Sequence, residues 1–97
     1  MRTFEKEVAE SLAKEDRNRG NQTIAVPVLS GAYPNEYFLT NVHLALGDAQ
    51  TEAQMLGDER RERMFVVKIP DAYIVLTDEE YIAVIGVGHS DMIVSEH

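Results

Sequence analysis

The segment from Gly86 to Asp91 brings together residue types that serve in nucleophilic catalysis and in phosphate binding. A nucleophile, its base and the group that orients the base must converge in space, usually from separate elements, whereas His89, Ser90 and Asp91 are neighbours in the chain. A dinucleotide-binding loop also needs a helix after its glycines, and only nine residues follow Gly88. We therefore interpret residues 86–91 as a glycine-rich turn, and we expect neither catalytic residues nor a cofactor.

The histidines and carboxylates offer metal ligands, but their spacing does not match a known type of site. The histidines contain no i,i+4 pair, and the chain contains no H-E-x-x-H or EF-hand pattern. The absence of cysteine excludes disulfides, zinc fingers and iron–sulfur clusters. We expect loose surface binding of cations at Asp78, Glu79 and Glu80 at most, and no dedicated metal site.

Charge is distributed unevenly along this chain of 97 residues, which carries a formal net charge of −8. Residues 1–20 are neutral, whereas residues 69–97 contain no Lys or Arg and carry a net charge of −6. This balance excludes most passive binders of nucleic acids and anionic membranes, because these need a cationic face. It predicts either a negative surface that docks a basic partner or acidic loops that serve only solubility. The residues that we expect to bind the partner are Asp71, Asp78, Glu79, Glu80, Asp91 and Glu96.

The first element expected along the chain is a helix over residues 3–20. Thr3 can act as its N-cap, and Gly20 is the residue type expected just beyond a helix C-terminus. One narrow stripe of the helix is apolar, flanked by two alanines, and its large residues recur at steps of four: Phe4, Val8 and Leu12. We expect this stripe to supply the packing of the helix.

A second, short helix is expected over residues 49–56, where Asp48 can cap its start and Gly57 can end it. The apolar content of this segment is weak, so a strand is the alternative. The charged stretch that follows, residues 58–63, is helix or loop. Its arginines alternate with acids, and we interpret it as a solvated face of mixed charge.

Alternation of apolar and polar residues predicts the strands of a sheet. Pro27 donates no backbone hydrogen bond, so its strand belongs at an edge or a bulge. Residues 81–85 are apolar on both faces, which is typical of a central strand. The segments that we expect to be strands are 22–29, 36–46, 65–69, 72–77, 81–87 and 92–94.

The whole chain is therefore expected to be one α+β domain, residues 1–97. The predicted architecture is an amphipathic N-terminal helix packed on a mainly antiparallel sheet of five or six strands, with a short second helix. The N-terminus lacks the apolar segment of a signal peptide, and the longest apolar run, residues 81–88, is too short to span a membrane. These features predict a cytoplasmic protein.

After these exclusions, the expected function is that of a non-enzymatic protein which binds and inhibits or regulates a partner protein. Its acidic C-terminal region would occupy a basic site, in the manner of nucleic-acid mimics, as in phage counter-defence proteins, immunity proteins and antitoxins. One alternative is an acidic chaperone or adaptor, a homodimer that holds a client segment. The other is a small-ligand-binding domain that uses the loops at 30–36 and 86–91. The edge-like strands at residues 22–29 and 92–94 favour a homodimer over a monomer.

Overall fold

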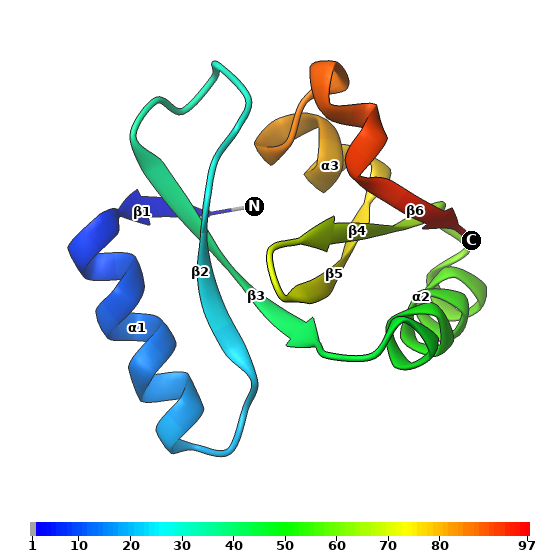
Figure 1. Ribbon diagram of the computed structural model, residues 1–97, viewed down its shortest axis with the longest axis horizontal. Coiled ribbons are helices and arrows are strands. Elements are labelled where there is room, and N and C mark those ends of the chain that lie inside the picture. Colours follow the sequence, from blue (N-terminus) through cyan, green and yellow to red (C-terminus); the bar gives the residue numbers. More distant parts are fainter. Residues whose placement is uncertain (1) are drawn as a thin grey trace.

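The computed structural model describes residues 2–97 and shows an α+β fold with a six-stranded antiparallel sheet (Figure 1). No helix in this described range has both the length and the apolar character needed to cross a membrane. The elements in chain order are β1 (Thr3–Glu5), α1 (Lys6–Asn18), β2 (Thr23–Pro27), β3 (Glu36–His43), α2 (Leu46–Arg60), β4 (Met64–Ile69), β5 (Ala72–Thr77), α3 (Asp78–Val84), the 3-10 helix η1 (Val87–Met92) and β6 (Ile93–Glu96).

The long strand β3 joins two parts of the sheet. Its first residues pair with β1 on one edge, and β2 runs antiparallel along the opposite edge. Its last two residues, Val42 and His43, pair with β5, which continues the sheet through β4 to β6. We call β1, α1, β2 and their stretch of β3 the N-terminal region, and α2, β4, β5, α3, η1 and β6 the C-terminal region.

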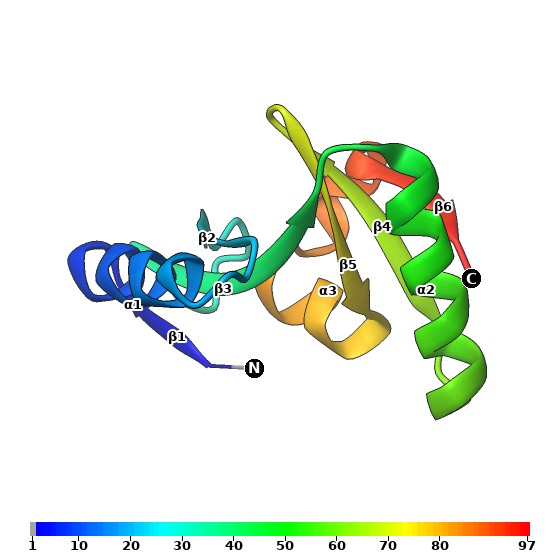
Figure 2. The ribbon, with the colours of Figure 1, turned by 90° about the horizontal axis from the view of Figure 1, so that it is seen from below.

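The C-terminal region places helices on both faces of β4 and β5, as Figure 2 shows. On one face α2 buries Ala49 and Ala53 against Met64 and Val66. On the other face α3 contributes its buried residues to a larger cluster that extends to β2 and β3; its members include Val26, Phe38, Phe65, Ile74, Leu76, Tyr81, Val84 and Ile85. Strand β4, which lies between β5 and β6, is therefore buried on both faces.

Strand β2 has a free edge within the described chain, because it pairs only with β3. Val28 donates to Glu36, and Val42 donates to the carbonyl of Gln22, so even-numbered residues of β2 face β3. Pro27 is odd-numbered and therefore faces outward, where its missing N–H removes a donor from the exposed edge. The edge position expected for Pro27 is confirmed.

The N-terminal helix differs from the prediction in its start and in its buried face. Residues Thr3–Glu5 are a strand, so Thr3 is not an N-cap and Phe4 is not part of the helix. Val8 is 46% exposed, and the buried residues of α1 are the two alanines, Ala9 and Ala13. The helix lies close to β2 and β3, where small side chains fit and a row of large ones does not. Its expected end is confirmed, because Gly20 has a φ of +93° just beyond the C-cap.

Two predictions in the second half of the chain were wrong. The second helix is longer than residues 49–56: it starts at Leu46 without a side-chain cap and passes through Gly57 to Arg60. Residues 81–84, which we expected in a central strand of 81–87, belong to helix α3, and residues 87–92 form η1. The remaining predicted strands, including the last one, are present with small shifts of their ends.

Candidate functional site

The acidic segment Asp78-Glu79-Glu80 begins a helix and is not the turn between two strands that the sequence suggested. The Thr77 hydroxyl accepts from the backbone N–H of Glu80 at 3.1 Å, and the Glu80 carboxylate accepts from the N–H of Thr77 at 2.9 Å. This capping box satisfies two backbone donors at the start of α3. Glu80 is therefore half-buried and structurally engaged, whereas Asp78 and Glu79 are exposed.

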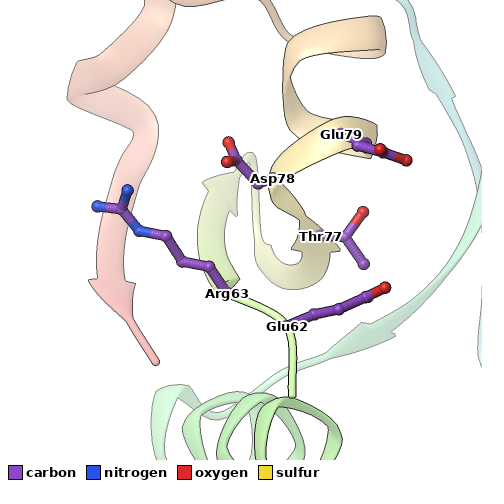
Figure 3. A pocket seen from close by; sticks show the side chains of 5 residues that line it. All are labelled: Glu62, Arg63, Thr77, Asp78 and Glu79. Carbon is purple, nitrogen blue, oxygen red and sulfur yellow. The ribbon is translucent and has the colours of Figure 1, made fainter. Parts of the chain in front are cut away.

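Asp78 and Glu79 line a small depression of about 170 Å³ between the start of α3 and the start of β4. Figure 3 shows the Thr77 side chain between those of Glu79 and Glu62, while Asp78 and Arg63 extend to the other side. Arg63 donates to the Glu96 carboxylate at 2.8 Å on neighbouring β6. In the lining of this depression Arg63 is the one cationic residue, and it is already paired, so the negative charge of the acids is only partly compensated.

Two of the predicted partner-binding residues, Asp71 and Asp91, do not form one surface with this group. Asp71 lies in the turn before β5 and Asp78 directly after it, so the strand separates them by roughly 20 Å at about 3.4 Å per residue. Asp91 lies in η1 and precedes Met92, which lines a depression together with Pro70. The acids thus divide into two exposed groups: Asp78, Glu79 and Glu96 at one end of β5, and Asp71 and Asp91 toward the other.

An apolar groove lies beside Pro70 and Met92, the chain neighbours of Asp71 and Asp91. It consists of two adjoining depressions of about 350 and 380 Å³, which share Leu29. The side chains that line the first include Ile24, Pro27, Ile69, Pro70 and Met92, and those that line the second include Ile82, Ile85, Val87 and His89. Three of these large apolar side chains are exposed: Val87 by 81%, Ile82 by 55% and Leu29 by 39%.

The loop after β2 is held onto the end of α3, and this contact forms the groove. The N–H groups of Leu29 and Ser30 both donate to the carbonyl of Val84, at 2.7 and 3.2 Å. The Ser30 hydroxyl also donates to the carbonyl of Ala83. Gly86 passes close to this loop with a φ of +87°, and a Cβ at that position would lie 3.4 Å from Ser30. That distance is an ordinary van der Waals contact, so the positive φ is what favours glycine at this position.

Tyr81 lies beneath the exposed face of α3 and is 5% exposed. Its ring packs against Phe65, with 5.3 Å between the ring centroids. Among residues 2–97 its hydroxyl finds no hydrogen-bond partner. Burial raises the pKa of Tyr81, and the negative charge of Asp91 raises it further.

The other residues whose types can serve in catalysis do not converge on one site. His89, Ser90 and Asp91 are consecutive residues of η1. His43, at the end of β3, pairs with Glu52 on α2, while the hydroxyl of Ser30 is engaged by α3. Within residues 2–97 there is no group of three His, Asp or Glu residues arranged to hold a metal ion.

Comparisons of the chain with protein-family models, with curated proteins and with solved structures give no match. The candidate site is therefore defined by its own geometry: an acidic start of α3, an apolar groove and a second acidic group. The sequence indicated the acids. It did not indicate the groove, because Ile82 and Val87 were assigned to a buried strand.

Proposed function

We propose that this chain is a non-enzymatic protein that binds a partner protein with a basic surface and inhibits or regulates it. The observation that carries the proposal is the pair of exposed acids Asp78 and Glu79 at the start of α3. They adjoin Glu62, and the nearby Arg63 is paired with Glu96. A coherent negative field of this kind steers a basic partner toward the surface and accelerates association.

The position of α3 supports the same function. The capping box fixes the first turn of the helix, and the opposite side of the helix is anchored by buried Tyr81 and Val84. The acids therefore stand on a rigid element, so little conformational entropy is lost when a partner binds. A basic nucleic-acid-binding site is the kind of surface that such acids would occupy.

The experiment begins with affinity purification from the native host, mass spectrometry and preparation of the captured partner. Association rate and affinity are then measured for the wild type, for Asp78→Lys/Glu79→Lys and for Glu10→Lys/Glu15→Lys. The last variant is the matched control, because it changes the net charge equally at exposed positions of α1. We expect the α3 variant to lower the association rate by about tenfold at low salt and the control to leave it nearly unchanged.

Salt provides the second readout. Wild-type affinity should fall as salt rises, because attraction between exposed charges is screened over about 8 Å at physiological ionic strength. An affinity that is equal at low and high salt would contradict the proposal and favour the chaperone or adaptor alternative, in which apolar contacts dominate. Equal losses in the two double variants would show that only total charge matters.

A further inference from the structure

Arg63 is the cation beside the acidic start of α3, and it lies between two carboxylates, Asp78 and Glu96. We propose that Glu96 acts on partner binding through Arg63: it holds the guanidinium away from Asp78, so that the charge of Asp78 stays uncompensated. Glu96 is thus a positioning residue and not one of the contact residues that the sequence suggested. This inference rests on the function proposed above and adds to it how the charge of the docking surface is controlled.

The backbone places Asp78 opposite Arg63. Strands β4 and β5 pair with Met64 across from Thr77. Asp78 follows Thr77, and its N–H donates to the carbonyl of Arg63 at 3.3 Å, so the antiparallel hydrogen-bonding pattern continues to this pair. Opposite residues of such a pair have Cβ atoms about 5 Å apart and side chains on one face. Figure 3 shows both side chains extending to the same side, so rotation of the Arg63 side chain is enough to bring the guanidinium to Asp78.

Glu96 draws Arg63 in the other direction, toward β6. Strand β6 pairs with β4 so that Glu96 lies across from Phe65, two residues along β4 from Arg63. The Nη2 atom of Arg63 donates to the Glu96 carboxylate at 2.8 Å, and its Cζ atom lies 5.1 Å from the centroid of the Phe65 ring. Within residues 2–97 the pair with Glu96 is the one ion pair that Arg63 makes.

The two positions of the guanidinium exclude each other. Because β5 and β6 flank β4 on opposite sides, an Arg63 side chain that turns toward Asp78 leaves Glu96. In that position it would neutralise Asp78 and cover the depression that both residues line. All three side chains are exposed, so either ion pair is weak, and the loss of one carboxylate is enough to change the balance between them.

The pairing also explains why Glu96 itself is a poor contact for a basic partner. A paired carboxylate adds little to the field at a distance, because the adjacent guanidinium offsets its charge. Within residues 2–97, neither Asp78 nor Glu79 has a cation within ion-pair distance. The attraction for a partner therefore comes from Asp78 and Glu79, and Glu96 contributes by keeping Arg63 occupied.

The first test measures the local potential without a partner. A cationic and a neutral nitroxide of similar size are added in turn to the 15N-labelled full chain, and relaxation of the Asp78 and Glu79 amide protons is recorded. In Glu96→Gln the ratio of the cationic to the neutral effect should fall by about twofold, because Arg63 turns to Asp78. Circular dichroism checks that the fold is retained, as expected for an exposed position.

The matched control repeats the substitution where Arg63 is absent. Arg63→Gln/Glu96→Gln is compared with Arg63→Gln, so that the same charge is removed but no guanidinium can move. We expect the ratio at the Asp78 and Glu79 amides to change much less in this background. An equal fall in both backgrounds would overturn the inference, because Glu96 would then act through its own charge.

The second test uses the captured partner and a double-mutant cycle. Asp78→Asn should lower the association rate at low salt by about twofold in the wild type and leave it nearly unchanged in Glu96→Gln, where Arg63 already neutralises Asp78. Equal losses in the two backgrounds would contradict the positioning role.

The two tests separate this inference from the proposed function. If Asp78→Lys/Glu79→Lys slows association while Glu96→Gln leaves the potential at the α3 amides unchanged, the inference fails and the proposed function stands. If Glu96→Gln lowers that potential only when Arg63 is present, while no substitution of Asp78 or Glu79 changes association, the positioning of Arg63 by Glu96 stands and the proposed function fails.

Discussion

The N-terminal and C-terminal regions share one sheet but are stabilised in different ways. The C-terminal region encloses large apolar side chains on both faces of β4 and β5. In the N-terminal region α1 buries Ala9 and Ala13, and polar contacts anchor its end: Arg17 donates to the Thr23 carbonyl, and the Thr23 hydroxyl lies 3.2 Å from the Asp16 carboxylate. Alanine burial removes little apolar area from water, so helix α1 adds less to the free energy of unfolding than β4 does.

This contrast indicates that α3, which carries the exposed acids Asp78 and Glu79, stands on the more stable part of the molecule. The groove is formed by α3 and η1, which pack on the large apolar cluster, together with β2 and its following loop. The buried residues of the N-terminal helix, Ala9 and Ala13, are not members of that cluster. We therefore expect local opening of α1 to cost less free energy than opening of α3, so that Asp78 and Glu79 keep their places when α1 opens.

The largest effect is expected from a pair of identical substitutions in the two regions. Leu76→Ala should lower the free energy of unfolding by about 2–5 kcal/mol, because Leu76 is 1% exposed in the large cluster and leaves a cavity. Leu12→Ala should cost less than about 2 kcal/mol, because Leu12 is only half-buried on α1. Urea unfolding monitored by circular dichroism measures both. Equal losses of unfolding free energy in the two variants would show that the two regions contribute equally to stability, which would contradict the difference described above.

A smaller effect on the free energy of unfolding is expected when the capping box at the start of α3 is disrupted. Thr77→Ala removes one half of the capping box and should cost about 1 kcal/mol. Thr51→Ala is the matched control: the Thr51 hydroxyl donates to a carbonyl within α2 at an exposed position, and its loss should change the free energy of unfolding by less than about 0.5 kcal/mol. Hydrogen exchange should show faster exchange at α3 amides in Thr77→Ala. Unchanged exchange at α3 would mean that packing alone holds the helix.

The smallest effect at neutral pH is expected for Tyr81→Phe. The buried hydroxyl has no hydrogen-bond partner in the described chain, so its removal should leave the free energy of unfolding equal or slightly higher. The raised pKa of Tyr81, caused first by burial and second by Asp91, means that the unfolded chain loses this proton at a lower pH than the folded one. The stability associated with Tyr81 is thus complete below a pH of about 10 and is lost as the pH rises through the folded pKa.

Denaturant unfolding of the wild type and Tyr81→Phe across alkaline pH checks this sign. The wild type should lose stability above a pH of about 10 more steeply than the variant. Parallel curves would show that ionisation of another group causes the alkaline loss. A large destabilisation by Tyr81→Phe at neutral pH would show that the hydroxyl has a partner, such as a bound water.

The sequence predicted those elements whose local pattern and tertiary environment agree. Strand β5 alternates buried and half-buried residues, β4 is rich in β-branched and aromatic residues, and Pro70-Asp71 indicates the turn between them, so both strands were found with little error. Helix α3 was missed because its β-branched residues favour a strand, while the Thr77–Glu80 capping box was the stronger signal for a helix start. The groove has no local signal, because it depends on the loop after β2 reaching Val84 across more than half of the chain.

The outward-facing Pro27 also has a consequence for molecules at high concentration. An open strand edge can act as a template on which copies stack one after another, and this is how ordered fibrils begin to grow. At β2 the missing N–H interrupts the ladder that a second copy would need to form. Polymerisation along this side is therefore suppressed by one residue, although the adjoining surface is apolar and would otherwise hold the copies together.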